Sequence, residues 1–121
     1  MDQAVLVNFD IEKGQRVIDA LDHAGYPPEV VMWAMLPEYE SWRFVVSSSH
    51  IHGYEEMVNQ LRGAGVLPGS RPSILLREMD DPFIKSLREN FANRDVDMGY
   101  NISSQYFGKQ YVDEAYVYRI R

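Results

Sequence analysis

The chain has 121 residues, of which 45% are hydrophobic and 25% are charged. These values lie close to the average of globular domains, argue against a disordered chain and predict a single domain spanning residues 1–121. The sequence contains no cysteine, which excludes a disulfide scaffold and thiolate chemistry.

The chain is acidic: 18 Asp and Glu residues against 12 Lys and Arg residues give a net charge of −6. A phosphate backbone or an anionic membrane surface would be repelled, so we expect neither nucleic acid nor membrane as a partner. The longest apolar run, Val30–Leu36, is far shorter than the roughly 20 residues that a membrane span requires. The N-terminal residues do not have the pattern of a signal peptide.

The first predicted element is an amphipathic helix that begins at Ile11, with Asp10 as its N-cap, and ends before Gly25. Residues 3–9 form either an extension of this helix, which we favour, or a short strand. The helix prediction rests on apolar or small residues at three- and four-residue spacing, namely Ala4, Val7, Ile11, Gly14, Ile18, Leu21 and Gly25.

Two strands follow this helix. Val30–Leu36 is apolar at every position, which predicts a strand covered on both faces. Residues 37–41 have the length of a hairpin loop, and Trp42–Ser49 is predicted to be the returning strand. Trp42, Phe44 and Val46 then share one face of that strand.

The remaining elements are a helix over residues 54–63, a short strand Ile74–Leu76 and a helix that Asp81 caps and Pro82 opens. The last two are the strands Asn101–Phe107 and Gln110–Ile120. The order α-β-β-α-β-α-β-β predicts an α+β fold, with a mixed or antiparallel sheet of about five strands and about three helices.

Four segments resemble a family of small bacterial proteins to which no activity is assigned. They are Ala20-Leu21-Asp22-His23-Ala24-Gly25-Tyr26-Pro27, Val31-Met32-Trp33, Ser41-Trp42-Arg43 and the C-terminal run from Tyr111 to Arg119. The family patterns are ALxxAGxP, ALW, WR and GxYIEDAYIYR. This chain departs from them at Val31-Met32 and at Lys109-Gln110. The resemblance implies a bacterial, cytoplasmic protein and supplies no catalytic residue.

The C-terminal hairpin is the most informative part of the sequence, because five of the eight tyrosines lie between residues 100 and 118. A type II′ turn at Gly108-Lys109 pairs Tyr106 with Tyr111 and Ser104 with Asp113. Strict alternation then gives two faces. The more apolar face, predicted to pack on the core, carries Tyr100, Ile102, Ser104, Tyr106, Tyr111, Asp113, Ala115 and Val117; the other carries Asn101, Ser103, Gln105, Phe107, Val112, Glu114, Tyr116 and Tyr118.

We interpret the second face as a surface for a ligand or partner, because tyrosine presents a flat apolar ring with a polar tip. The candidate binding residues are Tyr116, Tyr118, Glu114, Gln105, Ser103 and Asn101. The alternative is that the two tyrosines only cover the sheet edge or pack under a helix.

A second candidate site is His50-Ile51-His52. If the strand from Trp42 continues, His50 and His52 point the same way and could bind a metal, with Glu55 or Glu56 as a further ligand. The alternative is a solvated connection between a strand and a helix.

The residues favour a non-catalytic protein over an enzyme, since the sequence has no nucleophile elbow, P-loop or Rossmann glycine pattern. We therefore expect a binding or interaction module without a cofactor. Its partner is a second copy of the chain in a homodimer, another protein or a small molecule. Two other functions stay open: a metal-dependent enzyme or metal-binding protein using His50 and His52, and an acidic partner, resembling an immunity protein or antitoxin, that charge steers to a basic target.

Overall fold

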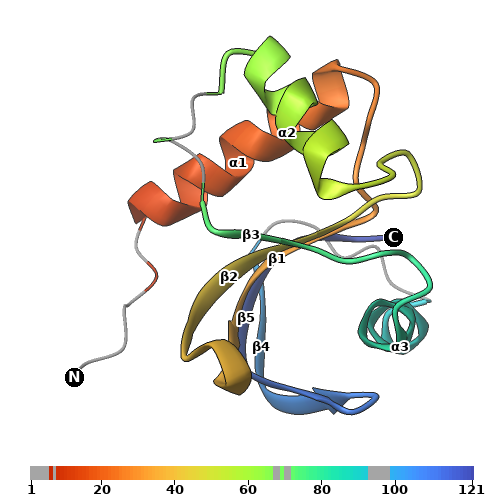
Figure 1. The fold of residues 1–121 in the computed structure, drawn as a ribbon. Coiled ribbons are helices and arrows are strands. Elements are labelled where there is room, and N and C mark those ends of the chain that lie inside the picture. The colour runs from red at the N-terminus through yellow and green to blue at the C-terminus, as the bar shows by residue number, and fades with distance from the viewer. Residues whose placement is uncertain (1–5, 7, 67–68, 70–71, 93–98) are drawn as a thin grey trace.

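A computed structural model describes residues 6, 8–66, 69, 72–92 and 99–121 (Figure 1). It confirms the predicted α+β class and the predicted order of elements. In chain order the elements are α1 (Asn8–His23), β1 (Val30–Leu36), the 3-10 turn η1 (Pro37–Tyr39), β2 (Ser41–Ser47), α2 (Tyr54–Gly63), β3 (Ile74–Leu76), α3 (Pro82–Asn90), β4 (Tyr100–Phe107) and β5 (Gln110–Ile120).

The five strands form one mixed sheet in the order β3-β2-β1-β5-β4. Only the β2–β3 pair is parallel among the described strands; the other neighbours are antiparallel. Helices α1 and α2 lie on one side of the sheet and α3 lies on the other, where the β4–β5 hairpin curls beneath it (Figure 1). The strands at the two edges are therefore β3 and β4.

The central strand β1 is buried at all seven positions, as its unbroken apolar sequence predicts. Its alternate side chains divide between two cores. Val31 and Trp33 pack under α1 and α2, whereas Met32 and Ala34 pack against α3. The predicted face of β2 is also confirmed, because Phe44 and Val46 belong to the core under α1.

Helix α1 begins at Asn8 and not at Ile11, so the predicted N-cap role of Asp10 is wrong. Tertiary contacts hold its first turn: the Trp33 indole donates to the Asp10 carbonyl at 3.1 Å, and the Tyr118 hydroxyl donates to the Ile11 carbonyl at 2.6 Å. Residues 1–5 and 7 lie outside the described part of the chain, and with them most of the segment for which helix and strand were weighed. The cap of α3 is confirmed, since the Asp81 carboxylate accepts from the Phe83 amide at 2.9 Å.

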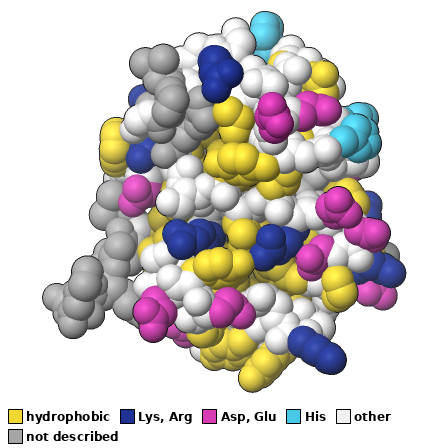
Figure 2. Space-filling view, in the orientation of Figure 1, with side chains coloured by type: hydrophobic (Ala, Val, Ile, Leu, Met, Phe, Trp, Pro, Cys, Tyr) yellow, Lys and Arg dark blue, Asp and Glu magenta, His cyan; other side chains and the backbone are white. Residues whose placement is uncertain are grey.

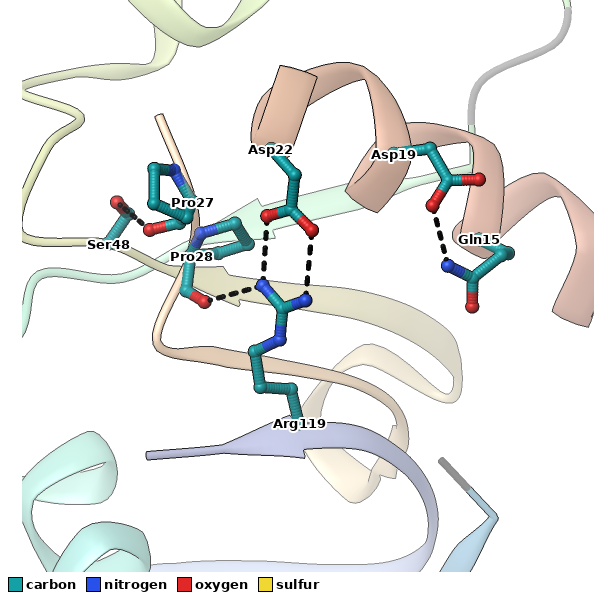
Figure 3. A network of polar contacts seen from close by, with 7 residues as sticks. All are labelled: Gln15, Asp19, Asp22, Pro27, Pro28, Ser48 and Arg119. Carbon is teal, nitrogen blue, oxygen red and sulfur yellow. Dashed lines mark hydrogen bonds and ion pairs between the residues drawn. The ribbon is translucent and has the colours of Figure 1, made fainter. Parts of the chain in front are cut away.

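Gly14 allows α1 to approach the sheet closely. A Cβ at this position would lie 2.5 Å from Phe44 Cε1 and 2.5 Å from the Tyr118 hydroxyl oxygen. At the other end of the helix, Arg119 donates two hydrogen bonds of 2.9 Å to the Asp22 carboxylate and one of 3.2 Å to the Pro28 carbonyl (Figure 3). These contacts fix both ends of α1 on β5.

The turn of the C-terminal hairpin is confirmed at Gly108-Lys109, where Gly108 has φ 65° and Lys109 keeps a negative φ. The pairs on either side also follow the predicted register, from Phe107–Gln110 to Tyr100–Val117. Ser104 and Asp113 are the exception. Neither is paired in the ladder, and Ser104 adopts a left-handed conformation with φ 44°.

The strict alternation predicted for the hairpin is therefore wrong beyond Ser104. Phe107 and Val112 turn to the α3 side and join the core with Ile102, Ala115 and other residues of that face. Because cross-strand partners share a face, Gln105 lies on the side of Val112, and the Tyr106–Tyr111 pair lies on the opposite side. The reversal closes the hairpin over α3, where Phe107 lies 6.3 Å from Phe83 between ring centroids.

A second irregularity lies in β5 next to the central strand. Val31 pairs with Arg119 and Met32 pairs with Val117, so Tyr118 is an extra residue without a direct partner on β1. Such a bulge changes the direction of the side chains that follow it. It leaves Tyr118 and Arg119 both on the side of α1, which explains how one strand supplies both of the contacts that hold this helix.

Candidate functional site

Two rows of cross-strand neighbours cross the α1 side of the sheet. One row runs Phe44, Trp33, Tyr116, Asn101 through β2, β1, β5 and β4. The next row runs Trp42, Met35, Glu114, Ser103 through the same strands. The N-terminal turn of α1 reaches the first row through the Trp33 hydrogen bond, and the second row lies beyond it.

A groove lies where α1 stops covering the sheet. Its volume is about 490 Å³, within the range of sites for small molecules or single side chains. We call it the hairpin groove, and it is lined by Leu6, Ile11, Met35, Trp42, Asn101, Ile102, Ser103, Glu114, Ala115 and Tyr116.

The lining combines an aromatic and apolar floor with a polar rim. Met35 is almost fully buried, and the Trp42 and Tyr116 rings are half-buried. Glu114 is exposed and is the one acidic or basic residue among those that line the groove. It takes part in neither of the two ion pairs found among the described residues, so its carboxylate has no cation within the chain segments described. The groove thus combines two aromatic rings and a single acidic side chain in one lining.

Four of the six predicted binding residues line this groove: Asn101, Ser103, Glu114 and Tyr116. The structure brings them together on one face, as the hairpin register predicts. Whether they bind a ligand stays a prediction.

Tyr118 does not belong to the groove, and its predicted place on an open face is wrong. The side chain is only 4% exposed because the bulge turns it beneath α1. There its ring packs edge-on against Phe44, with the ring centroids 5.7 Å apart. Burial raises the pKa of the Tyr118 phenol well above its ordinary value, and the nearby Trp33 indole opposes that rise only in part. Tyr118 is therefore a neutral hydrogen-bond donor that holds α1.

Gln105 is also misplaced in the sequence prediction. It is exposed, but the reversal at Ser104 puts it on the α3 side of the sheet, away from Tyr116. The Tyr106–Tyr111 pair takes its place on the groove side, with ring centroids 4.9 Å apart and Tyr106 66% exposed. A serine in the left-handed region is uncommon, and no pattern in the sequence predicts it.

Trp42 and Met35 were missing from the predicted site. The sequence predicts that Trp42 shares a face of its strand with Phe44. It does not predict how much of that face α1 covers, and therefore does not show that Trp42 borders an open groove. Met35 lies within a strand that is apolar throughout, so its sequence neighbourhood does not separate it from the other core residues. The pairing of β1 with β5 is the information that places Met35 beside Glu114.

The two histidines occupy a different part of the molecule. The premise that the strand continues to His52 is wrong, because β2 ends at Ser47. The chain turns there, since the Ser48 hydroxyl donates to the Pro27 carbonyl at 3.1 Å (Figure 3) and accepts from the His50 amide at 3.1 Å. His50 and His52 are both exposed, and no group of three or more His, Asp or Glu side chains in the described segments is arranged to hold a metal ion.

His52 lines a second cleft, of about 720 Å³, which we call the β3 cleft; His50 does not. This cleft lies along β3 and is bounded by residues 48–54 and residues 77–80. It contains none of the predicted hairpin residues, so the hairpin groove and the β3 cleft are separate features at different strands of the sheet.

No family model matches the chain, and no curated protein or solved structure matches it either. None of the helices in the described residues has the length and hydropathy that crossing a membrane requires.

Proposed function

We propose that this protein is a non-catalytic interaction module whose hairpin groove receives an arginine or lysine side chain of a partner protein. The observation that carries the proposal is the position of Glu114 between Met35 and Ser103 in one cross-strand row, with the Trp42 and Tyr116 rings in the same groove. An apolar floor with one carboxylate suits a side chain that has an aliphatic stem and a cationic head.

The energetics favour a cation over a neutral group. A guanidinium or ammonium group near an aromatic face gains about 0.5–2 kcal/mol, depending on how far it is desolvated. The Glu114 carboxylate adds a charge partner at the exposed rim, where salt screens the interaction. An anionic group placed in the same groove would meet Glu114 and no compensating cation among the lining residues.

The surroundings favour a protein as the source of this cation. Tyr106 and Tyr111 extend the groove side of the hairpin with exposed or half-buried rings, and tyrosine is enriched in protein interfaces. The net charge of −6 steers a basic protein toward the molecule and disfavours the close approach of a second acidic copy. A basic partner agrees with the acidic regulatory role that the sequence left open.

The proposal is tested with a fluorescein-labelled nonapeptide in which arginine alternates with serine. Its twin carries citrulline at every arginine position, which keeps the shape and removes the charge. We expect the arginine peptide to bind more tightly in fluorescence anisotropy, and its affinity to fall when salt is raised.

Variants then locate the binding site. Glu114→Gln and Trp42→Leu should each weaken binding of the arginine peptide at least about threefold. The matched control is Glu89→Gln, which makes the same charge change on α3, on the other side of the sheet. Equal effects of Glu114→Gln and Glu89→Gln, together with none from Trp42→Leu, would mean that only net charge attracts the peptide, and the proposal would fail.

A further inference from the structure

The outer edge of β3 presents unpaired backbone groups. The Phe44 amide donates to the Ser73 carbonyl at 2.8 Å, and the Arg77 amide donates to the Val46 carbonyl at 3.0 Å. In a parallel ladder, alternate residues of a strand bond to the same neighbour, so Leu75, midway between Ser73 and Arg77, also faces β2. The peptide groups of Ile74 and Leu76 consequently point away from the sheet.

These outward groups lack partners within the described segments. The Ile74 amide, the Ile74 carbonyl and the Leu76 amide take part in no hydrogen bond there, and the Leu76 carbonyl accepts only a long one, 3.4 Å, from Arg77 Nη1. All three residues of β3 line the β3 cleft. The cleft therefore has the edge of a strand as its floor, which is where an added strand would bind.

The walls of the β3 cleft combine apolar and acidic side chains. Ile51 and Met79 are apolar residues on opposite walls, one from each bounding segment. Figure 2 views the molecule from this edge and shows hydrophobic side chains across the middle, with Lys or Arg side chains among them and acidic side chains at the right. An extended segment with alternating side chains would meet both kinds of surface.

The lining of the cleft is net negative, because it contains the carboxylates of Glu78 and Asp80 and the single cation Arg77. Arg77 also lines the cleft, but its guanidinium already has partners in the chain: Nη2 donates to the Tyr39 hydroxyl at 2.8 Å, Nη1 donates to the Leu76 carbonyl at 3.4 Å, and Nε lies 3.8 Å from the Asp81 carboxylate. Glu78 and Asp80 also line the cleft and belong to neither ion pair of the described residues. The cleft is thus complementary to a basic segment.

We propose that the β3 cleft binds an extended segment of a partner protein, with alternating apolar and basic side chains, which adds to β3 as a sixth strand. This surface is independent of the hairpin groove, because the two share no lining residue and β3 contributes to the cleft alone. The three residues of β3 span roughly 10 Å, so about three residues of a bound extended segment would pair with this edge.

The probe is an acetylated, amidated hexapeptide in which valine and lysine alternate, followed by NMR of the ¹⁵N-labelled full chain. We expect it to shift the amide signals of Ile74 and Leu76 and to slow their hydrogen exchange. A twin peptide that is N-methylated on alternate residues, along the edge that faces β3, should bind at least about tenfold more weakly, since it cannot form the ladder. Equal binding of the two peptides would overturn the proposal.

Leu76→Pro removes the outward amide and leaves the bonds to β2 in place, and proline is tolerated on an edge strand. Leu76→Ala is its matched control, because both variants lose the leucine side chain and only the proline loses the donor. We expect Leu76→Pro alone to lose peptide binding, and the double variant Glu78→Gln/Asp80→Asn to weaken it about three- to tenfold. Equal binding by the proline and alanine variants would contradict the proposal. The proposal would also be contradicted if, without peptide, the Ile74 and Leu76 amides became more protected from hydrogen exchange as the protein concentration rises. That result would mean that a second copy of the chain pairs with this edge.

Discussion

Ser104 and Asp113 lie opposite each other in the C-terminal hairpin, and both fall out of the β4–β5 ladder at the same level. The pairs on either side, Ser103–Glu114 and Gln105–Val112, keep one register but put their side chains on opposite faces. This reversal decides which tyrosines border the hairpin groove, so the conformation of Ser104 is central to the site.

Ser104→Gly should stabilise the protein by up to about 1 kcal/mol, because glycine adopts a φ of 44° without the steric cost that serine carries. Ser104→Val should destabilise it by about 1–2 kcal/mol, because a β-branched side chain is poorly accommodated in that region. Urea unfolding of both variants measures the difference. A valine variant as stable as the wild type would show that residue 104 has an ordinary extended backbone.

Gly14→Ala should lower the free energy of unfolding by about 1–3 kcal/mol, since the new methyl group would lie within 2.5 Å of Phe44 and Tyr118. The matched control is Gly63→Ala in α2, where no atom lies within 4 Å of the added Cβ and helix propensity alone should stabilise by up to about 1 kcal/mol. Thermal unfolding of the two variants should therefore shift in opposite directions. If both gain stability, α1 does not pack closely on the sheet at Gly14.

Tyr118→Phe should lower the free energy of unfolding by about 0.5–1.5 kcal/mol, because it removes the hydrogen bond to the Ile11 carbonyl and keeps the ring. The cost should also depend on pH. The pKa of Tyr118 is raised in the folded state, so its neutral form contributes its full stability below the unfolded value of about 10.

As pH rises above about 10, the unfolded chain loses the proton first, and the wild type should lose stability progressively. The free energy of unfolding of the Tyr118→Phe variant should fall less over the same pH interval. The free energies of the two proteins, plotted against pH, should therefore converge at high pH. Tyr26→Phe is the control for a tyrosine whose ring is only half-buried. A constant difference between wild type and Tyr118→Phe from pH 8 to pH 11 would contradict the buried neutral phenol.

The paired hydrogen bonds of Arg119 and Asp22 should show an interaction energy of about 0.5–1 kcal/mol in a double-mutant cycle with Arg119→Met and Asp22→Asn. The two-point geometry favours a measurable value, and the partial exposure of Asp22 makes it sensitive to salt. If the effects of the two single substitutions on the free energy of unfolding are additive at low ionic strength, this pair does not hold the end of α1 to β5.

Much of the fold follows from patterns that are local in the sequence. The unbroken apolar run of β1 predicts a doubly covered strand, Asp81-Pro82 predicts the start of α3, and Gly108-Lys109 predicts the hairpin turn. Each depends on residues that are neighbours in the chain, so one sequence is enough to find it.

The candidate site was only partly predictable, because its limits depend on contacts between distant segments. The sequence groups Glu114 with Tyr116 and Ser103 through the hairpin register, but it does not reveal the bulge that turns Tyr118 under α1. It also does not reveal that β2 stops at Ser47, since the tertiary bond from Ser48 to the Pro27 carbonyl helps to turn the chain. The histidine prediction failed for this reason.

The most direct test of the hairpin groove as a cation site is an isotope-edited NOE measurement on the complex with the arginine–serine nonapeptide. We predict NOEs from the arginine δ-methylene protons of the peptide to the ring protons of Trp42 and Tyr116, which become weaker in the Glu114→Gln variant under the same conditions. NOEs to rings outside the groove, such as Tyr54 on α2, with none to Trp42 or Tyr116, would contradict the account.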